Sequence, residues 1–182
     1  LALQDHLPNI VSVVYVVGGL AADSDEPMPS EMREKIQKIW GHIERVVPGT
    51  QFNHEFWKVN TPVRSTYPAC RAILAAKDQG DEFVLQMLQT IQRKYYQDAK
   101  NPSLQTVLHS SALEIGLDGD QFSQDLTSDK IELKLQNDIK KARSLGGNSF
   151  PTLCLIHNNK QFPIAIDYSN WDTMYDEVME AL

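Results

Sequence analysis

The chain has 182 residues, a hydrophobic content of 42% and a formal net charge of -7. This length suffices for one domain with a substantial core, or for one domain that carries an insertion. The acidic charge argues against a nucleic-acid-binding surface, which needs clustered Lys and Arg, and no apolar run approaches the roughly 20 residues that span a bilayer.

The N-terminal part of the sequence predicts a helix followed by a buried strand. Residues 1–7 carry leucines at helical spacing, and Pro8 stops the pattern. Residues 10–17 are almost wholly apolar and β-branched, and Gly18-Gly19 ends the run. Such a run is expected of a strand covered on both faces. A helix that leads into such a strand is the second half of a β-α-β unit, so we expect the first strand to be missing from the chain.

A block of helices is predicted from Ser30 onward, because the apolar spacing there changes to the helical period of about 3.6 residues. The predicted helices cover residues 30–46, 69–77, 103–115, 121–126 and 129–145, and one more carries the stripe Val84, Leu88, Ile91 and Tyr95. The acidic loop before the block, with Asp23, Asp25 and Glu26, lacks the ligand spacing of an EF-hand and is predicted to be solvated. The histidines show no metal-ligand spacing, so we expect no metal site.

The strand pattern returns after Pro151. Residues 152–156 and 162–166 flank Asn158-Asn159, a turn pair that tolerates positive φ, and together they predict an antiparallel hairpin followed by an amphipathic helix. A proline at the start of a strand within a tight turn is a place where a cis X-Pro bond can form. An ordinary proline at a strand start is an equally good interpretation of Ser149–Thr152 taken alone.

The order helix, strand, helical block, proline, hairpin and helix is the plan of a thioredoxin fold with a helical insertion. Together with several short motifs, it resembles the DsbA-like branch of the thioredoxin superfamily, nearest to the FrnE-like and hydroxychromene-carboxylate isomerase-like proteins. The motifs are Val16-Val17-Gly18-Gly19-Leu20, Thr61-Pro62-Val63-Arg64-Ser65 with Arg71-Ala72, Ala75-Ala76-x-x-Gln79-Gly80, Gly116-Leu117 with Phe122, Leu145-Gly146-Gly147 and Ser149-Phe150-Pro151-Thr152.

The resemblance implies an α/β, thioredoxin-like domain made of residues 1–26 and 144–182, with an all-helical insertion domain at residues 27–143. It also implies that Phe150-Pro151 is a cis bond facing a Cys-x-x-Cys motif, and that the Phe150 backbone pairs with an extended substrate. That motif would lie upstream of Leu1, because the chain holds no Cys-x-x-Cys and neither Cys70 nor Cys154 occupies its position.

The site residues that the resemblance suggests form two groups. Phe150 and Pro151 are the catalytic loop, and the substrate-binding candidates are Ser149, Thr61, Arg64, Gly18 and Gly19. The leading hypothesis is a thiol-disulfide oxidoreductase that acts on protein or small-molecule thiols. It would need no cofactor, with glutathione as a candidate substrate or co-substrate, and no nucleic-acid or membrane partner. The cytoplasm is the compartment suggested by the sub-branch.

Two alternatives stay open. The first is a glutathione-dependent isomerase or transferase of the kappa class or the hydroxychromene-carboxylate isomerase type, with Thr61, Arg64 and Ser149 along a glutathione groove. The second is a redox-inactive thioredoxin-fold protein that holds a peptide partner.

Overall fold

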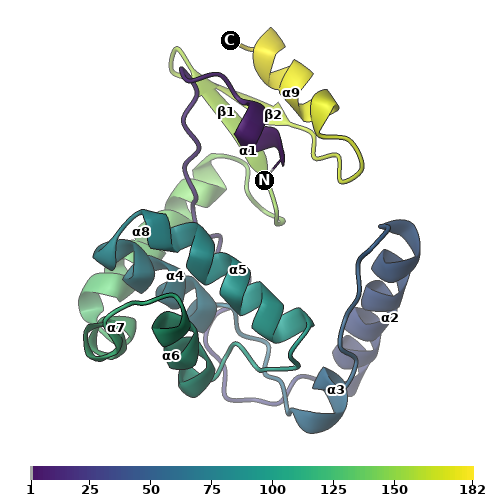
Figure 1. Cartoon of the computed structure of the whole chain (residues 1–182), viewed down its shortest axis with the longest axis vertical. Helices are drawn as coiled ribbons and strands as arrows, with labels where there is room; N and C mark the ends of the chain where they lie inside the picture. The colour runs from purple at the N-terminus through teal and green to yellow at the C-terminus, as the bar shows by residue number, and fades with distance from the viewer. Residues whose placement is uncertain (1) are drawn as a thin grey trace. The chain divides into compact units, whose positions relative to one another are not determined.

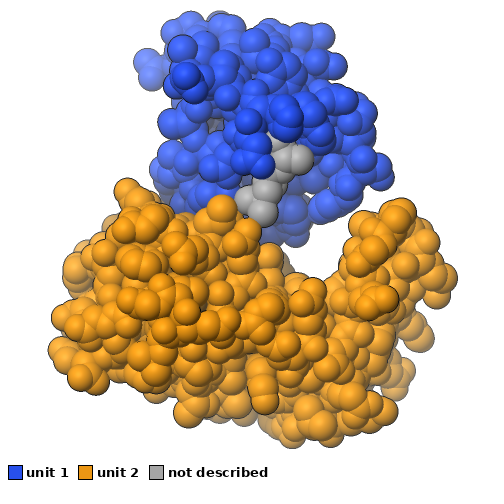
Figure 2. Space-filling model, in the orientation of Figure 1, with its two compact units in different colours: residues 1–18, 138–182 blue, residues 19–137 orange. Residues whose placement is uncertain are grey.

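The computed structural model describes residues 2–182, with side chains from residue 3 onward. It divides into two compact units, shown in different colours in Figure 2. Unit 1 consists of the chain up to Gly18 together with Asp138–Leu182, and unit 2 of Gly19–Asn137. Helix α8 (Asp129–Ser144) contributes residues to both. Among the described helices, none combines the length and the apolar character needed to cross a bilayer.

The sheet of unit 1 is the predicted antiparallel hairpin. Strand β1 (Leu153–His157) pairs with β2 (Lys160–Ile164), in a register that runs from Leu153 opposite Ile164 to His157 opposite Lys160. Asn158 and Asn159 form the turn with φ of 48° and 59°. Asn tolerates this left-handed conformation better than most residues, which is why the Asn pair located the hairpin correctly.

Two helices lie beside this hairpin in unit 1 (Figure 1). Helix α1 (Ala2–His6) packs against α9 (Trp171–Glu180), and α9 in turn packs against β2. The ring of His6 stacks on that of Trp171, with centroids 3.9 Å apart. Both helices were expected from the sequence, although Leu1, which the predicted first helix included, lies outside the described residues.

The predicted buried strand at residues 10–17 is wrong. This segment is outside any strand, and Ile10 and Val14 are 82% and 61% exposed. A strand is stable only where its N–H and C=O groups find a ladder partner, and the described sheet consists of β1 and β2 alone. The apolar run instead borders a cavity of about 330 Å³ together with β1 and α9. The composition of this segment predicted a strand buried on both faces, whereas the structure gives it apolar neighbours around this cavity and no strand pairing.

Unit 2 is helical, as predicted from the change in period. Its helices are α2 (Ser30–Val46), α3 (Phe56–Val59), α4 (Tyr67–Gln79), α5 (Glu82–Tyr96), α6 (Gln105–Glu114) and α7 (Gly119–Leu126), joined by the start of α8. Helix α4 packs against α5, α6 and α7 (Figure 1). Met87, Leu108 and Phe122 are completely buried in this unit. In α5 the predicted stripe residues Val84 and Ile91 are buried, whereas Leu88 is half-buried and its neighbour Met87 takes the core position.

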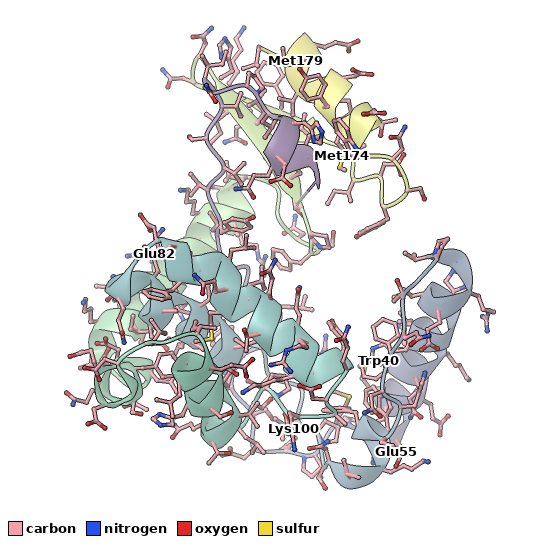
Figure 3. All side chains as sticks on the ribbon, in the orientation of Figure 1. Trp40, Glu55, Glu82, Lys100, Met174 and Met179 are labelled. Carbon is pink, nitrogen blue, oxygen red and sulfur yellow. The ribbon has the colours of Figure 1, made fainter. Side chains whose placement is uncertain are left out.

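A second core in unit 2 is aromatic. Trp40, labelled in Figure 3, is the buried residue of α2. Its ring stacks on Phe52 with centroids 4.9 Å apart and meets Trp57 at 5.0 Å. Further rings around it belong to Phe56, Tyr95 and Tyr96. Offset and edge-to-face ring pairs add to simple area burial, so this cluster holds α2 and α3 to the end of α5.

The carboxylate of Asp78 on α4 lies between two lysines of α8. The Nζ atom of Lys130 lies 2.7 Å from Oδ2 of Asp78, and Lys134 contacts Oδ1. Burial by itself raises the pKa of Asp78, but the hydrogen bonds and charges of the two lysines outweigh it, so the pKa lies below its ordinary value. This ion pair joins α4 to the first turns of α8.

The helical core gives a first prediction. Phe122→Ala leaves a cavity at a fully buried position and should lower the free energy of unfolding by about 3–5 kcal/mol. Leu133→Ala, at a position 64% exposed, should change it by less than about 0.5 kcal/mol. Urea denaturation followed by circular dichroism measures both, and similar losses for the two variants would contradict this core.

The Asp78 ion pair gives a second prediction. The pKa of the Asp78 carboxyl is lowered in the folded state, so the ion pair stabilises the fold at pH values above the unfolded-state pKa of about 3.9. This contribution is lost as the pH falls through the lower folded-state pKa. Asp78→Asn should therefore lower the melting temperature at neutral pH, and its difference from wild type should shrink below about pH 4. Asp176→Asn, at an exposed position of α9, should show no such trend.

Candidate functional site

The loop that follows α8 begins with a glycine cap. Gly146 has φ of 80°, a left-handed conformation that favours glycine. The N–H of Gly146 donates to the carbonyl of Arg143 at 3.1 Å, and that of Gly147 donates to the carbonyl of Ala142 at 2.8 Å. This pair of bonds is the Schellman motif. It satisfies the last carbonyls of α8 and sets the direction in which the chain leaves the helix.

The segment Ser149–Thr152, here called the proline loop, comes next. Its Phe150–Pro151 peptide bond is cis. The hydroxyl of Thr152 donates a hydrogen bond of 2.5 Å to the carbonyl of Ser149, which closes the turn around the proline. All residues of the proline loop are exposed, so a ligand of unit 1 can reach them.

The ring of Phe150 lies directly against Gly18. Gly18 is the last residue of segment 10–18 of unit 1, which is here called the extended segment. A Cβ atom at Gly18 would lie only 2.0 Å from Cζ of Phe150 and 2.1 Å from Cε1. On the other side, the guanidinium carbon of Arg143 lies 5.4 Å from the centre of the Phe150 ring, within the range of a cation–π contact. Arg143 also donates a hydrogen bond to the carbonyl of Gly147.

Gly18 and Gly19 are therefore glycines for different reasons. At Gly18 the space for a side chain is taken by Phe150. Gly19, the first residue of unit 2, is buried and has φ of 53°, a conformation that costs other residues energy. Of the predicted substrate-binding residues, the structure brings Gly18 together with the proline loop.

The other predicted residues, Thr61 and Arg64, belong to unit 2. Thr61 borders a cavity of about 600 Å³ whose other lining residues include hydroxyl, amide and charged side chains. Arg64 is exposed and does not contribute to that lining. Of these two residues of one sequence motif, Thr61 therefore borders the cavity and Arg64 lies at the surface outside its lining.

Arg71 is the central charge of this cavity in unit 2. Its guanidinium donates to both carboxylate oxygens of Asp23, at 2.6 and 2.8 Å, and to Glu132 at 3.0 Å. The hydrogen bonds to Asp23 are the main reason that the pKa of Arg71 is raised. Asp23 was predicted to lie in a solvated loop. Its side chain is 55% exposed, but it is also a bidentate partner of an arginine that is only 17% exposed.

Three residues of these sites were missed or underrated by the sequence reasoning. Arg143 was read only as part of a helix, although a cation in the last turn, shortly before an aromatic residue, is a signal that could have been used. Asp23 and Glu132 are separated from Arg71 by 48 and 61 positions, and nothing local indicates such pairing.

Neither cysteine belongs to the proline loop or to the described lining of the cavity in unit 2. Cys154 in β1 and Cys70 in α4 are half-buried and belong to different units. The Cys154 thiol donates weakly to the carbonyl of Leu155 at 3.7 Å. Within residues 2–182, no group of three or more His, Cys, Asp or Glu side chains could hold a metal ion.

A family model described as Thioredoxin matches residues 3–175. The ClpXP adapter protein SpxH of Halalkalibacterium halodurans is 25% identical over 130 residues, 71% of this chain and 42% of that protein. SpxH of Bacillus subtilis is 29% identical over 127 residues, 68% of this chain and again 42% of that protein. The chain thus spans less than half the length of these curated relatives.

Solved structures share the fold at low sequence identity. A candidate protein disulfide isomerase from Nitrosomonas europaea superposes with a TM-score of 0.76 at 20% identity, covering 88% of this chain and 78% of that one. The cytosolic disulfide reductase DsbM from Pseudomonas aeruginosa superposes with a TM-score of 0.73 at 20% identity, covering 99% and 86%. DsbM solved with GSH gives 0.71 at the same identity and coverage.

These matches bear out the resemblance at the level of the superfamily, whereas the FrnE-like sub-branch stays a prediction. The α/β, thioredoxin-like fold class predicted from the order of elements is confirmed. Since the family model extends over nearly all of its residues, the chain belongs to the thioredoxin family.

Proposed function

We propose that this chain is part of a DsbA-like thiol-disulfide oxidoreductase that acts on protein or small-molecule thiols. Its redox cysteines would lie outside residues 1–182, and the proline loop would be the platform that presents the substrate to them. The observation that carries the proposal is the thioredoxin match across residues 3–175, which includes the exposed proline loop. The disulfide isomerase-like and reductase neighbours support it at the level of fold.

The chemistry is thiol-disulfide exchange. A thiolate attacks one sulfur of a substrate disulfide, a mixed disulfide forms, and the first substrate thiolate leaves. The second cysteine then attacks the mixed disulfide, so that the enzyme dithiol becomes a disulfide while the substrate disulfide becomes two thiols. Two molecules of a small thiol such as glutathione would reduce the enzyme disulfide again and leave as their own disulfide. Residues 1–182 would hold the substrate backbone at the exposed proline loop.

Glutathione is the small-molecule thiol that we assign to this reaction. The support is indirect, since it is DsbM that was solved with GSH. In unit 2 of this chain, Arg64 offers an exposed cation for a glutathione carboxylate, and the hydroxyl of Thr61 offers a hydrogen bond. A glutathione-dependent transferase or isomerase would use the same residues without reducing a protein disulfide. We also assign the protein to the cytoplasm, in line with the cytosolic description of DsbM.

A second candidate function is a redox-inactive adapter. It is favoured by the curated relatives, which are described as ClpXP adapter proteins. In this case the exposed proline loop would hold a peptide of a partner protein, and no electron transfer would take place. One fold can host unrelated functions. A measurement of thiol-dependent turnover is therefore needed to distinguish the oxidoreductase from the adapter.

The oxidoreductase proposal predicts thiol-dependent reduction of insulin by the full-length protein that contains this chain. Phe150→Ala should lower kcat/KM by about tenfold to a hundredfold, because loss of the ring lets the proline loop move relative to the redox thiols. Tyr168→Ala removes an aromatic side chain that is 71% exposed in the same unit and should leave kcat/KM unchanged.

The outcomes of the insulin assay separate the candidates. No thiol-dependent turnover by the full-length protein would reject the oxidoreductase and leave the adapter and the glutathione-dependent transferase or isomerase. Equal losses for Phe150→Ala and Tyr168→Ala would reject the proline loop as the substrate platform.

Glutathione binding gives a separate prediction. Calorimetry should detect saturable binding to the full-length protein, and Arg64→Ala should weaken it about fivefold or more, because a charge-assisted hydrogen bond is lost. Lys38→Ala removes another exposed cation of unit 2 and should leave the affinity unchanged. Saturable binding without insulin reduction would favour the transferase or isomerase, and no binding would exclude glutathione as a substrate.

A further inference from the structure

We propose that Gly18 and Arg143 are positioning residues for the proline loop. They hold the ring of Phe150 between the end of the extended segment and the last turn of α8. We call this arrangement the Phe150 clamp. The clamp itself is a feature of unit 1, and its effect on turnover rests on the proposed function.

The first half of the clamp is steric. With a Cβ atom at Gly18, the tip of the Phe150 ring would be 2.0–2.6 Å away, which is far inside van der Waals contact. This need for glycine comes from the close approach of the ring and not from a left-handed backbone, since Gly18 is absent from the positive-φ glycines of the described chain. Any larger residue there must push Phe150 out of its place.

The second half is electrostatic. Arg143 places its guanidinium over the Phe150 ring, 5.4 Å from the centre, and donates to the carbonyl of Gly147. A guanidinium offers several donors in a fixed plane, so one side chain can bind the loop backbone and cover the ring together. Arg143 therefore connects the glycine cap of α8 to the proline loop.

The glycine cap restricts the same loop from its N-terminal side. A Cβ atom at Gly147 would approach the carbonyl oxygen of Ala142 to 2.8 Å and Phe150 Cε1 to 3.5 Å. The chain between α8 and the proline therefore passes close to the helix end. It has little room to take another path.

Core packing does not account for the arrangement. Phe150 stays 39% exposed, whereas the core aromatic residues Phe56 and Phe122 are 1% and 0% exposed. The ring is thus held at a surface, beside exposed Ser149 and Pro151. The position of the Phe150 ring sets the direction of the backbone on either side of Pro151. This is the part of the loop that a substrate strand would meet.

The geometry of the clamp can be tested without turnover, by NMR of the full-length protein. Protons at the edge of an aromatic ring and those over its face shift in opposite directions, so the Hα resonances of Gly18 should be displaced from ordinary glycine values. They should return to those values in Phe150→Ala and stay displaced in Tyr168→Ala. Ordinary Gly18 resonances in the wild-type protein would overturn the clamp.

A double-mutant cycle tests the steric half. Gly18→Ala should lower kcat/KM for insulin reduction by about tenfold or more when Phe150 is present. In the Phe150→Ala background the same change should have less than about a twofold effect, because no ring remains to be displaced. Equal effects in both backgrounds would overturn the steric role. Circular dichroism of each variant shows whether folding is retained. If Gly18→Ala alone unfolds, a folded double variant still identifies the Phe150 ring as the obstacle.

The electrostatic half is tested by Arg143→Met, Arg143→Lys and the control Lys140→Met, which alters another exposed cation of α8 in unit 1. A mispositioned loop should raise KM about threefold or more with kcat within about twofold, and Lys should restore part of the loss. A fall in kcat at unchanged KM, in proportion to the unfolded fraction, would overturn the positioning role. If the wild-type protein has no turnover, the proposed function fails, and the NMR measurement alone decides the clamp.

Discussion

The contact between an aromatic ring and a glycine is the constraint on which unit 1 depends. Phe150 occupies the space that a side chain at position 18 would need, so the end of the extended segment and the loop before β1 are held in one arrangement. Residues 18 and 150 are distant in sequence, and any side chain at position 18 would displace the Phe150 ring. The exposed proline loop is accordingly a surface feature with a defined conformation, which is what a substrate platform requires.

Unit 2 is organised by helix packing and by a small number of buried or half-buried charges. Arg71 satisfies its donors with Asp23 and Glu132, which lie on different elements, and Asp78 is paired with two lysines of α8. Such pairs add modest stability when exposed, but breaking a partly buried one leaves an uncompensated charge. These ion pairs therefore determine the arrangement of the loop before α2, helix α4 and the start of α8. They add less to the free energy of folding.

The comparisons include a disulfide reductase of the same fold and adapter proteins of related sequence, so the fold alone does not assign a function. Under the proposed function, the chain would contribute one half of a site, namely the exposed proline loop. Thiol-disulfide exchange needs a thiolate as the nucleophile, and neither Cys70 nor Cys154 belongs to a Cys-x-x-Cys motif. In that proposal the proline loop would orient the thiol-bearing substrate, and the redox cysteines would lie outside residues 1–182.

The sequence by itself determined most of the secondary structure and the fold class. Helical periodicity located α2, α7 and α8 to within two residues, and Asn158-Asn159 located the hairpin, because these signals act between neighbours in the chain. It also pointed to the proline loop. The tertiary structure decided the rest. Residues 10–17 have the composition of a strand, but pairing depends on a partner that local sequence does not supply. Likewise, the contacts of Gly18 with Phe150 and of Arg71 with Asp23 arise only when segments that are distant in sequence meet, and no local sequence pattern indicates which residues will meet.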